Sequence, residues 1–554
     1  MQLDCAYIGV RCKLRKKTDN STMIKRIVNY IIKLFRKIFK MDKTDKVEII
    51  NKYAELTNQI SSENILEGLI GFGLFAEKLP NFLSSESFLS WYLSNSKPQF
   101  ENKGRDYVRY ENMRNINIPR LLAIPNPFSY SNLCNTIAEN WDTIKNQLSE
   151  NVKNQKFKIS RIHIRKLKDK KCLFEMNYKN FEKDGNPELN IMIGKHFCVE
   201  ADIANCFPSI YSHSIPWALV GKERAKLNRD THSEWYNKLD KAIRNTKNEE
   251  TNGLLIGPHA SNLISEIILT KVDKTLYDKG YQYIRNVDDY KCYVHTYEQA
   301  ESFLLDLSTE LKNYELHLNN KKTKITQLPL ASVNVWVNKL NSFDFGNNLT
   351  EEKKVILELK RLRALLDLAI ELMVSENNSA IINYTFKIIS KKHLGNQAYN
   401  YYINYVHHLL LLYPYLTNII EEYVFVPFKV DPSKIKEISN DLYKVGIEKR
   451  FYEACSYSVF WALKYDFKIE NPFLKDSIKS NDCIFLLLGY VYANKLKDKD
   501  SIREYKQRAK ELAKTDFDRY WVFLYEVLTQ PDLVGDFKRL KKDKISFIKK
   551  DFEY

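Results

Sequence analysis

The stretch YIRNVDDYKCYV, residues 283–294, places Asp288 and Asp289 side by side between two short aromatic and β-branched runs. Such runs around a short turn are typical of a β-hairpin, whose tip would carry the two acids. Two carboxylates held about 4 Å apart repel by roughly 4 kcal/mol at an effective dielectric constant of 20. A divalent cation removes that penalty, because hard cations such as Mg²⁺ bind carboxylate oxygens. Asp-containing turns are common, however, so the pair alone does not identify a function.

A further acid stands at the end of a second predicted strand, in VEADIANCFPSIYSHSIPWAL, residues 199–219. The run ending at Asp202 has strand character and a helix is expected to begin near Pro208, so the carboxylate would lie at a strand end. An Asp-containing turn after a buried strand explains this stretch equally well. If Asp202 converges on Asp288, the chain has an oxygen-ligand site for Mg²⁺. Two such ions, roughly 3.5–4 Å apart, activate an attacking hydroxyl and stabilise the leaving oxygen in phosphoryl transfer.

Three other segments accompany these acids. GLLIGPHASNLISEI, residues 253–267, predicts a Gly-Pro turn and then a helix, where small residues allow a substrate to approach closely. LHLNNKKTKI, residues 316–325, predicts a basic strand. SRIHIRKLKDKK, residues 160–171, would place Arg161 and Arg165 on one face if it is a strand. For these basic residues a solvated strand face remains the alternative.

In chain order these blocks resemble the palm motifs of reverse transcriptases. The Asp202 block resembles motif A, GLLIGPHASN motif B, NVDD motif C and LNNKKTKI motif D. With FAEKLPNFLSSESF (75–88) and PRLLAIPNPFSY (119–130), they are similar to the bacterial abortive-infection reverse transcriptases of the AbiK type, which act in phage defence.

The resemblance implies a catalytic metal site. Asp202, the backbone carbonyl of Ile203 and Asp288 would bind two Mg²⁺ ions, or Mn²⁺ in their place, with Asp289 in support. Lys322 would neutralise or protonate the departing pyrophosphate. Asp202, Asp288, Asp289 and Lys322 are thus the expected catalytic residues.

The resemblance also implies a nucleotide site. Phe207 matches the bulky residue that clashes with a ribose 2′-hydroxyl, which favours dNTPs over NTPs. Arg161 and Arg165 are candidates to hold the triphosphate, since Arg presents fixed donors to phosphate. Gly257 and Ser261 of the motif B block are further nucleotide-binding candidates.

Two departures place ordinary templated copying in doubt. Asn286 stands where most reverse transcriptases have Tyr, and Ile256 stands where the retroviral motif B has Gln. In the resembled group, DNA is made without a supplied template on a tyrosine of the enzyme. The sequence has 35 Tyr and does not identify the primer; Tyr30 and Tyr53 are candidates.

Other partners also follow from the resemblance. It implies dNTPs as substrates, a DNA product attached covalently to the protein, and a homo-oligomer, either trimer or hexamer. A noncoding RNA is a further candidate partner.

Composition supports a polyanionic partner. The 86 Lys and Arg against 69 Asp and Glu give a formal net charge of +17, which suits nucleic acid or an acidic membrane surface. The nine Cys form no CxxC pair, so reduced thiols in a cytosol fit best. No apolar run approaches 18 residues and no signal-peptide cleavage site is evident, so we expect a cytoplasmic protein without membrane association.

The sequence predicts an α+β protein in three regions. Residues 1–95 form an N-terminal helical region with a basic amphipathic helix, MIKRIVNYIIKLFRKIFK (23–40), which favours docking on its own chain or a sister subunit over a membrane anchor. Residues 96–345 form reverse-transcriptase fingers and palm. Residues 346–554 form an all-helical, HEAT-like domain that replaces the thumb.

The alternative is a catalytically vestigial, nucleic-acid-binding scaffold of the same fold. Three retained acids in a basic chain favour the enzyme. A toxin RNase in the C-terminal region is disfavoured, because that region has no Arg followed four to six residues later by His.

Overall fold

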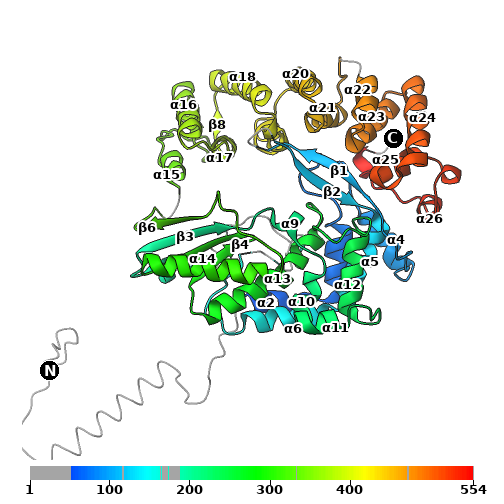
Figure 1. Cartoon of the computed structure of the whole chain (residues 1–554). Helices are drawn as coiled ribbons and strands as arrows, with labels where there is room; N and C mark the ends of the chain where they lie inside the picture. Colours follow the sequence, from blue (N-terminus) through cyan, green and yellow to red (C-terminus); the bar gives the residue numbers. More distant parts are fainter. Residues whose placement is uncertain are drawn as a thin grey trace, which may run out of the picture. The chain divides into compact units, whose positions relative to one another are not determined.

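The structure is a computed structural model of the chain. It describes residues 52–114, 118–161, 164, 172–173, 187–331, 334–470 and 473–552 (Figure 1). The chain divides into two compact units, Met1–Ile50 and Asn51–Tyr554, and all described residues lie in the second. The predicted basic helix at 23–40, Tyr30 and Arg165 therefore lie outside the described residues.

A four-stranded antiparallel sheet with strand order β4-β5-β3-β6 lies at the centre of the second unit. Its strands are β3 (Phe197–Asp202), β4 (Tyr283–Asn286), β5 (Asp289–Val294) and β6 (Lys324–Gln327). β4 and β5 form the predicted hairpin, and Val287 and Asp288 make its turn. The register pairs Asp202, the last residue of β3, with Asp289, the first residue of β5.

The two faces of this sheet differ in character, because successive side chains of a strand point to opposite faces. Val199 and Ala201 of β3 are buried, and both β3 and β5 pack against α14 (Tyr297–Lys312). Figure 1 shows α14 and α13 (His259–Asp278) along this side. Glu200 and Asp202 alternate with these residues and lie on the other face. The acid at the end of β3 therefore lies on the face of the sheet away from α14.

The remaining elements before β6 are short helices and one hairpin. β1 (Tyr107–Asn112) and β2 (Arg120–Pro125) pair in antiparallel fashion, and the Ala123 N–H donates to the Ile256 carbonyl at 2.8 Å, which ties the hairpin to the turn before α13. The helices are α2 (Lys52–Asn58), α3 (Ser62–Leu66), the π-helical segment η1 (Glu67–Gly71), α4 (Glu86–Ser94), α5 (Pro127–Glu139), α6 (Trp141–Val152), α8 (Glu188–Met192), α9 (Cys206–Ser209), α10 (Ser214–Val220), α11 (Lys222–Leu227) and α12 (Trp235–Asn245).

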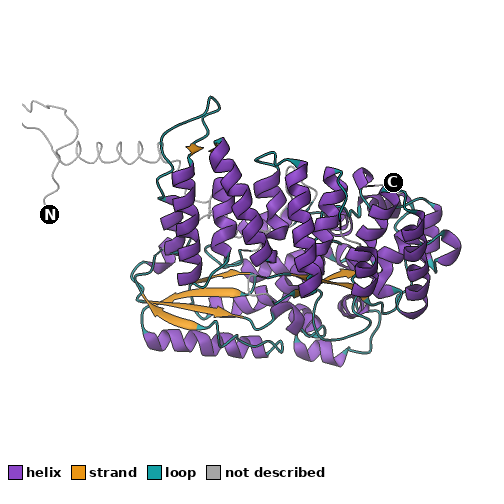
Figure 2. Ribbon diagram, turned by 90° about the horizontal axis from the view of Figure 1, so that it is seen from above, coloured by secondary structure: helices purple, strands orange, loops and turns teal. Residues whose placement is uncertain are grey.

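After β6 the described chain is almost entirely helical. The α-helices are α15 (Val335–Asn341), α16 (Leu359–Ser375), α17 (Ala380–Ile389), α18 (Asn396–Leu412), α19 (Thr417–Ile420), α20 (Pro432–Lys449), α21 (Tyr452–Tyr465), α22 (Phe473–Ser480), α23 (Cys483–Lys495), α24 (Lys499–Thr515), α25 (Trp521–Val527) and α26 (Asp536–Lys542). The short strands β7 (Ile356–Leu357) and β8 (His393–Leu394) pair in parallel. Figure 2 shows many of these helices with roughly aligned axes, and a HEAT-like repeat stays a prediction. Within the described ranges, no helix combines the length and apolar character needed to cross a membrane.

The C-terminal helices pack back onto elements that precede the central sheet. The Trp91 indole donates to Asp543 at 2.7 Å, and Arg519 pairs with Asp106 at 2.7 Å. Between these polar contacts, the Phe128 and Phe537 rings lie 4.5 Å apart. The last helices of the chain are therefore fixed to its early helices by both apolar and polar contacts.

A buried carboxylate, Glu453 on α21, joins the helical region to β1. It is 2% exposed and accepts hydrogen bonds from Asn112 Nδ2 at 2.7 Å and from the Met113 N–H at 2.6 Å. Burial raises the pKa of Glu453 to about 7, although these two hydrogen bonds oppose the shift. Ionisation of Glu453 therefore carries a desolvation penalty that the two hydrogen bonds offset only in part.

This contact predicts a pH-dependent stability. An acid whose pKa is raised in the folded state holds its proton more tightly when folded, so its contribution to stability falls as pH rises from about 4.5 to about 7. Glu453→Gln removes that dependence. The free energy of unfolding of the natural protein, minus that of Glu453→Gln, should fall by about 2–3 kcal/mol between pH 5 and pH 8 in denaturant titrations. Exposed Glu448→Gln is the control; a pH-independent difference for Glu453→Gln would contradict the assignment.

Candidate active site

Three acids converge at one edge of the central sheet. Asp202 and Asp289 are directly paired across β3 and β5, and such pairs have Cα atoms about 4.5–5.5 Å apart. The Ile203 N–H donates to the Asp288 carbonyl at 3.2 Å, which brings the hairpin turn to the same strand end. The Asp202 carboxylate is buried, Asp288 is half-buried and Asp289 is exposed.

The hairpin turn that carries Asp288 has an unusual backbone. Val287 has φ of 58°, in the left-handed region that β-branched residues rarely adopt. Such conformations persist where surrounding contacts hold them, and they cluster at functional sites. The turn is therefore held by its neighbours rather than by its own sequence preference.

The turn before β6 holds the Asp202 carboxylate. Asn319 Nδ2 donates to one carboxylate oxygen at 3.0 Å, and Lys322 Nζ donates to the other at 2.7 Å. Burial opposes ionisation of Asp202, but hydrogen bonds with Lys322, Asp289 and Asn319 outweigh it and lower the pKa of Asp202. The sequence suggested that Lys322 lies in a strand; it lies in this turn, from which its long side chain reaches the acid.

The other two acids have the opposite shift. Burial, and then the charge of Asp202, raise the pKa of Asp288. Burial, Asp202 and Asp288 raise the pKa of Asp289. The charge of Arg120 on β2 partly offsets the shift at Asp288. Burial and the neighbouring carboxylates thus both oppose ionisation of Asp288 and Asp289.

The donor set suits a hard divalent cation. Asp202, Asp288 and Asp289 offer only carboxylate oxygens, the ligands that Mg²⁺ and Mn²⁺ accept. Cys206 on α9 is the nearby soft ligand, but burial and the charge of Asp288 raise the pKa of its thiol, which stays protonated. The type of ligand atom therefore matches the metal that the sequence predicts.

A pocket of about 840 Å³ opens beside Asp202 and Asp289, and Asp288 is not among its lining residues in the described part of the chain. Its charged lining residues include Arg161, Asp202, Asp289, Lys291, Lys322 and Lys324. Arg161 is anchored by its N–H, which donates to the Arg285 carbonyl at 2.7 Å. Acidic and basic side chains thus line the same pocket.

Phe207, Gly257 and Ser261 lie near this region but do not line the pocket within the described part of the chain. Phe207 lies on α9, five residues after Asp202, and its carbonyl accepts from the Leu254 N–H at 2.7 Å. Gly257 has φ of 125°, and a Cβ there would lie 3.1 Å from the Ala123 carbonyl oxygen, so the position requires Gly. Ser261 is buried in the first turn of α13.

Tyr53 does not suit the role of primer. It is 2% exposed, and its hydroxyl donates to the Glu266 carboxylate at 3.1 Å. A primer hydroxyl must reach the nucleotide, whereas this one is enclosed in the protein interior. The burial of this hydroxyl therefore argues against Tyr53 as the primer, and the identity of the primer stays a prediction.

Sequence reasoning missed two residues near the acids. Asn319 lies within the LNNKKTKI block, and its amide bonds Asp202 directly. Arg120 lies in the PRLLAIPNPFSY block and acts on Asp288 through its charge. Both residues lie in segments that the sequence analysis identified. Their contacts with the acids join residues far apart in the chain, and such contacts leave no periodic pattern in the sequence.

Comparison with known families matches part of the chain. The family model of reverse transcriptases (RNA-dependent DNA polymerases) matches residues 143–351, which contain all three acids. Residues 143–351 are a reverse transcriptase domain. A reverse transcriptase domain indicates an enzyme of the nucleotidyltransferase class with a polymerase fold, and such domains generally use divalent metals.

Comparison with solved structures returns telomerases at low similarity. Truncated apo telomerase from Candida tropicalis is 12% identical with a TM-score of 0.25, and the match covers 44% of this chain and 55% of that chain. Untruncated apo telomerase from the same species is 10% identical with a TM-score of 0.32, covering 69% and 70%. Telomerase from Candida albicans in complex with a fragment of telomeric RNA is 11% identical with a TM-score of 0.26, covering 65% and 67%. No curated protein matches the sequence.

Because the three carboxylates repel one another, replacing one of them with a neutral side chain should stabilise the folded protein. Asp289→Asn keeps the side-chain size and removes one of three like charges. In chelator and low salt, its free energy of unfolding should exceed that of the natural protein by about 1 kcal/mol, a small value because solvent screens the exposed carboxylate. Thermal melts should also show that Mg²⁺ stabilises the natural protein more than the variant. Lower stability of Asp289→Asn in chelator would contradict repulsion at this site.

Proposed function

We propose that this protein is a reverse-transcriptase-like DNA polymerase that adds dNTPs by two-metal catalysis, primed by a tyrosine of its own chain. The observation that carries the proposal is the convergence of Asp202 with Asp288 and Asp289 at one sheet edge. The reverse transcriptase domain around these acids supports the same reaction class.

The residues divide the chemistry as follows. Asp202, Asp288 and the Ile203 carbonyl would hold the metal ions, with Asp289 in support. When bound, these ions lower the pKa of the attacking hydroxyl and stabilise charge on the leaving oxygen. Lys322, which already reaches the acid cluster, supplies a proton or positive charge to the departing pyrophosphate.

The reaction itself is a nucleotidyl transfer. The hydroxyl oxygen forms a bond to the α-phosphorus as the bond to pyrophosphate breaks, and the hydroxyl loses its proton. Arg161 in the acid-lined pocket supplies charged donors for the triphosphate. Phe207 excludes the ribose 2′-hydroxyl, which makes dNTPs the substrates.

We further propose that the protein acts in antiphage abortive-infection defence in the cytoplasm, as a homo-oligomer that carries its DNA product covalently. Asn286 and Ile256, which depart from the usual motifs, support synthesis without a supplied template. A tyrosine hydroxyl is chemically suited to priming, because it is an oxygen nucleophile like a 3′-hydroxyl.

A scaffold that only binds nucleic acid is the second candidate, favoured by the formal net charge of +17. Such a scaffold has no use for three converging acids, which repel a polyanion. A polymerase explains both features. Its basic surface would bind nucleic acid, and its three acids would bind divalent cations.

The deciding experiment incubates the purified full-length protein with labelled dNTPs and Mg²⁺, without primer, and resolves it on a denaturing gel. We expect label that remains with the protein, that is absent in Asp288→Ala and that is not produced from labelled NTPs. An exposed acid that does not line the pocket, as in Glu448→Ala, is the matched control and should label normally. Free labelled product alone would contradict self-priming, and no product under any metal condition would favour the scaffold.

A further inference from the structure

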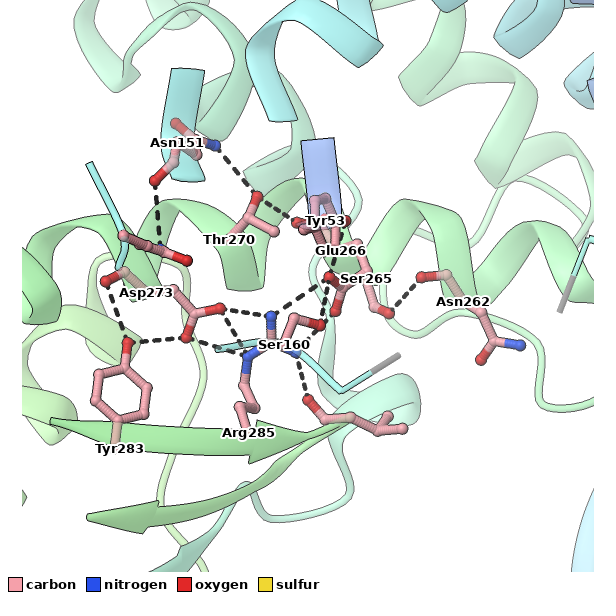
Figure 3. A network of polar contacts seen from close by, with 12 residues as sticks. Tyr53, Asn151, Ser160, Asn262, Ser265, Glu266, Thr270, Asp273, Tyr283 and Arg285 are labelled. Carbon is pink, nitrogen blue, oxygen red and sulfur yellow. Dashed lines mark hydrogen bonds and ion pairs between the residues drawn. The ribbon is translucent and has the colours of Figure 1, made fainter. Parts of the chain in front are cut away.

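The fully buried side chain of Arg285 projects from the face of the hairpin opposite Asp202 and Asp289. Its guanidinium donates to Glu266 Oε1 at 2.7 Å through Nη1 and to Asp273 Oδ2 at 2.6 Å through Nη2 (Figure 3). Nε adds a further bond to Asp273 Oδ2 at 3.0 Å. Arg285 is on β4, and the two acids are on α13.

The helix explains why both acids reach one guanidinium. Glu266 and Asp273 are seven residues apart on α13, which is about two helical turns, so they share one face. Burial disfavours the charged guanidinium, but Asp273 and Glu266 outweigh it and raise the pKa of Arg285. The Arg285 side chain therefore stays positively charged, and the two acids of α13 fix the orientation of its N–H donors.

One more bond connects this cation to the catalytic turn. Arg285 Nη1 also donates to the Val287 carbonyl at 2.7 Å. Val287 is the residue with the left-handed backbone, and Asp288 follows it directly. The guanidinium thus contacts the peptide that sets the position of Asp288.

The same network reaches the phosphate side of the pocket and the N-terminal helix. The Arg285 carbonyl accepts from the Arg161 N–H at 2.7 Å, and Ser160 Oγ donates to Glu266 Oε2 at 2.9 Å. Tyr53 of α2 donates to that same oxygen at 3.1 Å. Figure 3 shows Ser160, Tyr53 and Glu266 gathered around Arg285.

We propose that Arg285 is a positioning residue for the metal-binding acids: it transmits the placement of α13 to the Val287–Asp288 turn and to Arg161. The proposal rests on the proposed function, since it assigns Arg285 a role in that metal site. Lys cannot replace Arg here, because a single ammonium cannot span Glu266, Asp273 and the Val287 carbonyl with fixed geometry. Residues that orient metal ligands typically change metal affinity about 10–100-fold when replaced.

A purely architectural network is the competing explanation. A buried ion pair can serve the fold alone, and its loss then lowers stability without a specific effect on the site. The two explanations differ in one readout, the affinity for a divalent cation in protein that remains folded.

The test measures Mn²⁺ binding by isothermal titration in the natural protein, Arg285→Lys and Tyr283→Phe. Tyr283 donates to Asp273 Oδ1 at 2.9 Å, at the end of the network away from the turn, so Tyr283→Phe also loses a buried hydrogen bond. We expect Arg285→Lys to weaken Mn²⁺ binding about tenfold or more, and excess Mn²⁺ to restore part of its dNTP incorporation. Tyr283→Phe should lower the melting temperature while leaving Mn²⁺ affinity unchanged.

Each outcome separates the two proposals. Folded Arg285→Lys with natural Mn²⁺ affinity would overturn the positioning role and leave the polymerase proposal standing. Absence of Mn²⁺ binding in the natural protein would overturn both. If Arg285→Lys does not fold, Glu266→Gln replaces it, because it removes the charge that holds Nη1 beside the Val287 carbonyl; the same tenfold loss is then expected, and unchanged affinity overturns the role.

Discussion

Mutual repulsion between Asp202, Asp288 and Asp289 must be balanced where β3 meets the β4–β5 turn. On the pocket side, Lys322 and Asn319 hold both oxygens of Asp202. These contacts keep one acid ionised, while the pKa of each of the other two is raised. The arrangement leaves a negative site whose ligands suit a hard cation.

On the opposite face of the sheet, acidic side chains surround a buried cation. Arg285 is the buried cation there, and Glu266 and Asp273 surround it. Both faces of the hairpin are therefore fixed by charged groups, and the turn between them keeps an unfavourable backbone at Val287. The rest of the fold supports this arrangement. Helix α13 carries Glu266 and Asp273, and the C-terminal helices pack against elements that precede the sheet.

Much of the site lies in segments that the sequence distinguishes, because paired acids at a hairpin tip and an acid at a strand end leave local patterns. Those patterns give the strands and the order of the motifs. They do not give the turn position of Lys322 or the burial of Tyr53, which depend on packing between distant segments. The network around Arg285 was missed for the same reason: a charged residue in a strand gives no sign of its partners on a helix. The contact of Glu453 with Asn112 likewise joins residues too far apart in the chain for any periodic pattern.

The most direct measurement of the central claim is a crystal structure with Mn²⁺ and a non-hydrolysable dNTP analogue, with data collected at the manganese absorption edge. The account predicts two anomalous peaks between the carboxylates of Asp202 and Asp288, each also bound by triphosphate oxygens. A triphosphate bound elsewhere, with no anomalous signal at these acids, would contradict it.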